Sequence, residues 1–237
     1  MRTAMISMMV LLVALVSVGC GDSLMADHEE FRNIEPGEAD TVRGEIDLGV
    51  GQLWLVGGGS SLLDARFLYS EDSMRPELSY DVSGSVGNLN LSQPRVNSLR
   101  GFTNVTYQWD LRLGSDITFE SVDVEMGVGT ADLYFGGVDV ETLDVHLGVG
   151  DMKVDLTGPR ARDLKASVEG GVGRCVLTVP EDVGVRVEVE RGVSHLEVEG
   201  LRRGDGFYFN DAYGETDVEM RISVSLGVGQ IVVRSGR

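Results

Sequence analysis

Few residues in this chain have the types and spacing that catalysis or metal binding requires. The three histidines, His28, His146 and His195, are far apart in sequence, and none belongs to a His-x-x-x-His or Cys-x-x-Cys pattern. Beyond Cys20, the only other cysteine is Cys175, which falls in an apolar column of the repeat described below and is expected to be a small buried side chain. The sequence therefore predicts no catalytic residue, no metal site and no cofactor.

Cys20 is the residue whose chemistry is indicated most clearly, and that chemistry is lipidation. An apolar run, Met5 to Val18, follows the positive charge of Arg2 and is too short to span a bilayer comfortably. The stretch Val16-Ser17-Val18-Gly19-Cys20 resembles a bacterial lipoprotein signal. It predicts that residues 1–19 are a cleaved signal peptide and that a diacylated Cys20 holds the chain on a membrane. A plain secretory signal with an incidental cysteine and an uncleaved anchor are the alternatives.

Carboxylates recur at fixed distances from a repeated glycine. One column holds Glu45, Asp81, Asp123, Asp144 and Glu188, and a second holds Asp47, Glu125, Glu169 and Glu190. If the repeats stack as strands, like charges in a column lie about 4.8 Å apart and repel each other. Two interpretations stay open, namely a solvated acidic face and weak binding of divalent cations that stabilises the fold.

The repeated element is Gly-Val-Gly. Clear copies start at Gly49, Gly127, Gly148, Gly171 and Gly227, and degenerate copies start at Ser85 and Gly192. None is a phosphate-binding loop, because each is followed by a strand pattern without the lysine or the helix that such a loop needs. A recurrence about every 21–23 residues between Gly127 and Gly192 instead indicates stacked structural units.

Apolar residues occupy four columns around each glycine, at three residues before it and at one, four and six residues after it. In the copy at Gly148 these are Val145, Val149, Met152 and Val154. Alternation of period two predicts half-buried strands on both sides of the glycine, with all four residues pointing inward. The inward positions change parity at the second glycine, which predicts a corner or a β-bulge there.

These patterns predict an all-β fold, a β-solenoid of stacked two-strand coils with Gly-Val-Gly corners; the alternative is a β-sandwich. Residues 44–237 are expected to form this single domain. Residues 20–43 are polar and acidic and are expected to be a tether. A coil without the glycine signature is expected within residues 93–121, and the last copy, Met220 to Val233, is expected to close the stack.

An insertion at residues 201–217 carries four aromatic residues. They are Phe207, Tyr208, Phe209 and Tyr213, and they are the candidate interaction residues of the chain. Exposed aromatic side chains mark contact surfaces. They are also suited to cover the open end of a solenoid, so a cap is the alternative interpretation.

The quoted stretches together resemble the toast-rack domain of bacterial envelope proteins, which occurs in LiaF-like cell-wall stress proteins and in adhesin-like sequences. The resemblance is carried by Gly44–Gly51, Trp109–Leu113, Leu143–Leu156, Asn210–Gly214 and Leu226–Ile231. It implies a solenoid-like fold, an envelope location and no catalytic residues. A lipoprotein-like signal stands here in place of the transmembrane helices of the membrane-bound members.

The expected function is that of a non-enzymatic cell-envelope lipoprotein with a structural or interaction module, linked to envelope stress or adhesion. Alternatives are a glycan-binding or glycan-cleaving β-helix protein, and a sensor that binds a protein partner through residues 201–217. A net charge of −18 argues against nucleic acid as a partner. The expected partners are the membrane, through the lipid anchor, and an envelope protein. The expected location is the outer membrane facing the periplasm, or the cell surface.

Overall fold

A computed structural model describes residues 28–94 and 107–236, and its regular structure is almost entirely β-strand. Its elements are β1 (His28–Ile34), β2 (Thr41–Gly59), β3 (Leu63–Tyr69), the 3-10 turn η1 (Asp72–Met74), β4 (Glu77–Ser83), β5 (Val86–Ser92), β6 (Tyr107–Gly114), β7 (Thr118–Tyr134), β8 (Asp139–Asp155), β9 (Leu164–Pro180), β10 (Gly184–Glu199), β11 (Arg202–Arg203), β12 (Tyr208–Phe209) and β13 (Glu219–Gly236). Hydrogen bonds join all thirteen strands into one continuous sheet.

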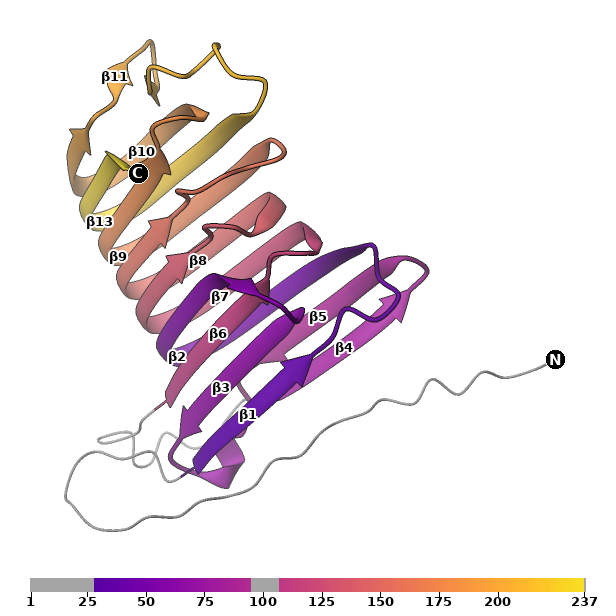
Figure 1. The fold of residues 1–237 in the computed structure, drawn as a ribbon. Helices are drawn as coiled ribbons and strands as arrows, with labels where there is room; N and C mark the ends of the chain where they lie inside the picture. The colour runs from indigo at the N-terminus through magenta and orange to yellow at the C-terminus, as the bar shows by residue number, and fades with distance from the viewer. Residues whose placement is uncertain (1–27, 95–106, 237) are drawn as a thin grey trace.

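Six long strands form the body of the fold, in the spatial order β2, β7, β8, β9, β13 and β10. Each crosses one Gly-Val-Gly corner or its degenerate copy and bends there, so that the strands lie side by side like ribs (Figure 1). We name the part before the corner the first arm and the part after it the second arm. Neighbouring strands pair in parallel and in register, with Val128 opposite Val149 and Gly129 opposite Gly150. The predicted β-solenoid is therefore confirmed.

The core lies between the two arms of each strand. In β8, Val145 on the first arm and Met152 and Val154 on the second arm are at most 2% exposed, as predicted. Leu143 and Leu147 add two further inward positions that the four-column pattern did not include. Burying an aliphatic side chain stabilises the fold by roughly 1.5–3 kcal/mol, and each coil contributes several such side chains.

The prediction that the corner valine points inward is wrong. Val149 is 47% exposed, and its equivalents Val50, Val128, Val172 and Val228 are exposed to a similar extent. The two arms meet at the corner, where the side chains of Leu147 and Met152 already fill the inner side. The residue at the apex of the bend must therefore point outward. The alternation of inward and outward residues is interrupted over the whole Gly-Val-Gly and not only at its second glycine.

The second glycine of each corner sits in a column where no side chain fits. At Gly150, φ is +141°, and a Cβ atom would lie 1.8 Å from the carbonyl oxygen of Gly129 in the neighbouring strand. Gly129, Gly173 and Gly229 have the same conformation and equally close neighbours. The corner thus needs glycine for its backbone conformation and for the close stacking of one strand on the next.

The stack does not follow the order of the chain. β13 lies between β9 and β10, so the expectation that the last copy closes the stack is wrong. The closing strand is β10, which carries Ser194 opposite Gly229 at the second-glycine position. A strand at the end of the stack pairs along its corner with one neighbour only, so its backbone is less restricted there. The corner of β10 can therefore do without the second glycine. β13 has a neighbouring strand on each side and keeps the complete Gly-Val-Gly.

At the other end of the stack, β2 divides the sheet into two branches. The first arm of β2 pairs with β5, which forms an antiparallel hairpin with β4 around Gly84. Ser85 therefore belongs to a hairpin and not to a solenoid corner. The second arm of β2 pairs with β6, followed by β3 and β1. β6 is the strand without a glycine signature expected within residues 93–121, and it supplies half a coil.

The prediction of a tether over residues 20–43 is wrong for its second part, because β1 belongs to the sheet. Residues 28 to 34 pair antiparallel with β3, in a register that places His28 opposite Tyr69. Glu30 of β1 forms ion pairs with Arg32 and Arg75. The acidic residue Glu30, which in the sequence looks like part of a solvated linker, thus pairs with basic residues in and beside the sheet. Residues 20–27, including Cys20, lie outside the described residues.

Candidate functional site

Cys175 lies in the core, as the sequence predicts. It is fully buried on the second arm of β9, and burial raises the pKa of its thiol to about 12. A thiol with this pKa is not a nucleophile at neutral pH. Cys20, the predicted lipidation residue, is not among the described residues.

The three histidines lie in different parts of the fold. His28 stacks on Tyr69 in the β1–β3 pair, His146 lies on the outer face of β8 and His195 is exposed on β10. Within residues 28–94 and 107–236, no three side chains of histidine, cysteine, aspartate or glutamate are grouped as a metal site requires. The hypothesis of cation binding along the acidic columns therefore has no ligand group to support it in this part of the chain.

The acidic columns form a shallow hollow of about 360 Å³ on the first arms of β7, β8 and β9. Its lining includes Asp123, Glu125, Asp144, His146 and Glu169. Burial raises the pKa of the Asp123 carboxyl, and the charges of Asp144 and Glu45 in the same column raise it further. The stacking of like charges predicted from the sequence is thus present and unfavourable.

Asp123→Asn is expected to raise the melting temperature at pH 7 by about 1–3 °C. A carboxyl whose pKa is raised in the folded state favours folding when protonated, at low pH, and loses that contribution as pH rises through its folded pKa. The gain should therefore shrink as pH falls through the folded-state pKa of Asp123, because the carboxyl then becomes neutral as well. Thermal melts between pH 3.5 and 8 measure this. Asp116→Asn, at an exposed position, makes the same charge change and should give no comparable gain; equal gains in both variants would contradict the prediction.

The aromatic residues predicted as interaction residues pack on each other. The ring centroids of Phe207, Phe209 and Tyr213 lie 5.7–6.1 Å apart, and all four aromatic residues of the insertion are half-buried. Arg186 of β10 lies 4.1 Å from the Phe207 centroid. Tyr208 and Phe209 form β12, which pairs with the start of β10. This arrangement favours a cap over the beginning of β10, and a contact role for these residues stays a prediction.

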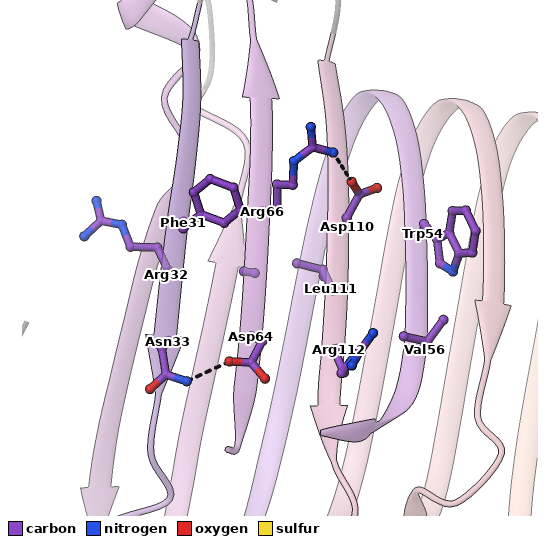
Figure 2. Close-up of a pocket in the computed structure, with 11 residues that line it drawn as sticks. Phe31, Arg32, Asn33, Trp54, Val56, Asp64, Arg66, Asp110, Leu111 and Arg112 are labelled. Atoms are coloured by element: carbon purple, nitrogen blue, oxygen red, sulfur yellow. Dashed lines mark hydrogen bonds and ion pairs between the residues drawn. The ribbon is translucent and has the colours of Figure 1, made fainter. Parts of the chain in front are cut away.

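A second hollow, which we name the aromatic groove, lies on the outer surface of β1, β3, β6 and the second arm of β2. Its volume is about 700 Å³ (Figure 2). Phe31 on one side is 59% exposed, and Trp54 on the other side is 54% exposed. Tyr134 of β7 lies beside Trp54, with 6.4 Å between the ring centroids, and extends that side. Large aromatic rings held in the open on a concave surface are a feature of binding sites.

Charged side chains of β3 and β6 form the floor of the aromatic groove. Arg66 donates one hydrogen bond to Asp110, at 2.9 Å, and another to Glu29, at 2.6 Å. Asn33 donates to Asp64 at 2.7 Å. Arg112 is exposed, and its guanidinium group has no hydrogen-bond or ion-pair partner in the part of the chain that the structure describes.

The sheet register explains why these residues meet. Across the four strands they form one row, which runs Phe31, Arg66, Asp110 and Trp54. Sequence reasoning missed this site. Trp54 stands between the inward residues Leu53 and Leu55, so its outward direction could have been inferred. Phe31 could not, because its stretch looked like a linker.

No helical segment in the described part of the chain has the length and apolar character needed to cross a membrane.

Comparisons with known proteins give a family and several structural relatives. The family model described as the N-terminal domain of toast_rack, DUF2154, matches residues 24–178. The crystal structure of a "putative cell adhesion protein" from Clostridium sporogenes aligns with a TM-score of 0.84 and 28% identity, over 88% of this chain and 99% of that chain. A "putative adhesin" from Bacteroides fragilis is 16% identical over 88% of this chain and 98% of that chain, with a TM-score of 0.29. No curated protein matches.

Proposed function

The chain belongs to the toast-rack family, whose N-terminal-domain model matches residues 24–178, and we propose that it is a non-enzymatic cell-envelope module that uses the aromatic groove for adhesion. The observation that carries this proposal is the pair of exposed rings, Phe31 and Trp54, held on either side of a fixed charged floor. The relative from Clostridium sporogenes, described as a putative cell adhesion protein, supports the same role. The rigid stack of coils serves to present this surface.

The proposal includes attachment to the membrane through a lipid on Cys20, at the outer membrane facing the periplasm or at the cell surface. The apolar run before Gly19 and Cys20 supports it. A lipid anchor would hold the module at the envelope, where an adhesion surface is useful. Mass spectrometry of the mature protein tests this part: a diacylglycerol on an N-terminal Cys20 supports it, and an unmodified cysteine contradicts it.

The adhesion role can be measured with beads that carry the purified mature protein. Beads with the wild-type protein should adhere to bacterial cells or to isolated cell envelopes. Adherence should fall at least about tenfold in the double variant with Phe31→Ala and Trp54→Ala, because exposed aromatic residues dominate the binding energy of most contact surfaces. Both side chains are exposed, so the melting temperature of the variant should stay close to that of the wild type.

Two further variants make the result specific. Val128→Ala removes an apolar side chain that is exposed on a corner, away from the aromatic groove, and should leave adherence unchanged. Phe207→Ala tests the alternative that the 201–217 insertion contacts a protein partner. If Phe207→Ala abolishes adherence and the double variant retains it, the contact surface is the insertion and the proposal for the groove is overturned.

A further inference from the structure

The spacing of the two sides of the aromatic groove sets the size of a ligand. Phe31 and Trp54 belong to β1 and β2, which are separated by β3 and β6. Three neighbouring strand spacings of about 4.8 Å place the two aromatic positions about 14 Å apart. Both occupy the same row of the sheet, with the Arg66–Asp110 pair between them (Figure 2). A ligand that touches both rings must therefore be extended and must lie across the strands.

The floor between the rings offers hydrogen bonds of both kinds. The carboxylates of Asp64 and Asp110 accept hydrogen bonds, and the guanidinium groups of Arg66 and Arg112 donate them. The Arg66 side chain is fixed by two carboxylates, and the Asp64 side chain is fixed by Asn33. These groups are held in place before a ligand arrives, which lowers the entropy cost of binding. Arg112 is a further donor, and a ligand would not have to break an existing hydrogen bond or ion pair to bind it.

Charge in and around the groove is nearly balanced. The charged side chains that face it are those of Arg66, Arg112, Asp64 and Asp110, and Glu29 forms an ion pair with Arg66, whereas the side chain of Arg32 points away from it (Figure 2). This balance stands out in a chain whose net charge is −18. An anionic ligand would meet the repulsion of the whole protein. A lipid tail would have to cover fixed charges. Neither is a good match for the groove.

An uncharged oligosaccharide matches all of these features. The C–H faces of sugar rings are flat and apolar and pack on aromatic rings, whereas their hydroxyl groups both donate and accept hydrogen bonds. About three sugar rings span a distance of about 14 Å, so that the outer two contact Phe31 and Trp54 and the middle one faces Arg66 and Asp110. We infer that the aromatic groove binds an uncharged glycan of the cell surface, recognised over about three sugar units. This inference rests on the proposed adhesion role and names its ligand.

Isothermal titration calorimetry with the mature protein tests the inference directly. The probes are the neutral trisaccharides maltotriose, chitotriose and mannotriose, the corresponding monosaccharides, and the acidic trigalacturonic acid. At least one neutral trisaccharide should bind, at least about tenfold more tightly than its monosaccharide, which cannot span both rings. Its affinity should change less than about twofold between 50 and 500 mM salt, because no net charge is neutralised on binding. Trp54→Ala and Phe31→Ala should each weaken it at least about fivefold, and Val128→Ala should not.

Three results would overturn the inference: no neutral trisaccharide binds, trigalacturonic acid binds more tightly than every neutral probe, or the affinity is unchanged in Trp54→Ala. Failure here can be separated from failure of the adhesion role by treating the target cells. If periodate oxidation of surface glycans leaves Trp54-dependent adherence intact and protease removes it, the groove binds a protein. The adhesion role then stands and the glycan inference is wrong. If wild-type beads never adhere, the adhesion role fails whatever the titrations give.

Discussion

Gly150→Ala is expected to destabilise the domain by at least about 4 kcal/mol, or to prevent its folding altogether. A Cβ atom at this position would lie 1.8 Å from the carbonyl oxygen of Gly129, far inside van der Waals contact. The atom it meets is backbone in the neighbouring strand, so no side chain can turn aside to make room. β7 and β8 would have to separate at the corner, where their hydrogen-bond ladder is in register on both sides.

The matched control for Gly150→Ala is Gly137→Ala. Gly137 also has a positive φ, +76°, but a Cβ atom there would meet nothing within 4 Å. This variant should cost only the backbone strain of a non-glycine residue, about 1–2 kcal/mol. Urea denaturation followed by circular dichroism compares the two free energies of unfolding. Similar values for both variants would show that close stacking of the corners is not what requires glycine.

Asn210→Asp is expected to destabilise the domain by about 3–5 kcal/mol at pH 7. Asn210 is 3% exposed. Its Nδ2 donates to the carbonyl oxygens of Pro180, at 3.0 Å, and Val183, at 2.6 Å, and its Oδ1 accepts from the Val185 amide, at 3.0 Å. In aspartate, a charged oxygen would replace the donor and face two carbonyl oxygens without a partner.

The melting temperature of Asn210→Asp should accordingly fall by roughly 10 °C at pH 7, and part of the loss should be recovered at pH 4, where the carboxyl gains a proton that it can donate. Asn90→Asp is the control, since Asn90 is exposed on β5 and the same exchange there should shift the melting temperature by no more than about 2 °C. A fall at Asn210 that does not depend on pH would indicate that a shape change, rather than a buried charge, is responsible.

Much of the solenoid could be predicted from the sequence because equivalent positions of neighbouring repeats pair with each other. Apolar residues equivalent to Val145 and Met152 stand at the same distances from the first glycine of each Gly-Val-Gly copy. Strands with the same pattern bury their apolar sides best when they stack in register. The direction of Val149 could not be predicted in this way. Alternation gives the inward side of each arm, but it does not say which residue of the corner lies at the apex.

The site was harder to predict because it depends on which strands become neighbours. Phe31 and Trp54 face the same groove only because β3 and β6 lie between their strands, and that order is a property of long-range pairing. β1 could not be recognised as a strand from the sequence, because Glu30 looks like part of a solvated linker until its partners Arg32 and Arg75 are known. By contrast, the buried state of Cys175 followed from one column of the repeat.

The position of β13 has a consequence for how the protein is made. Its residues leave the ribosome after those of β9 and β10, yet they pair with β9 on one side and with β10 on the other. On the β9 side, Ser223 meets Ser167 across a sequence separation of 56 residues. Coils up to β9 can be added one after another as the chain emerges, but β10 cannot take its place until β13 has been made. β13 therefore closes the domain from within, and a chain cut short before residue 219 would lack the strand that connects β10 to the stack.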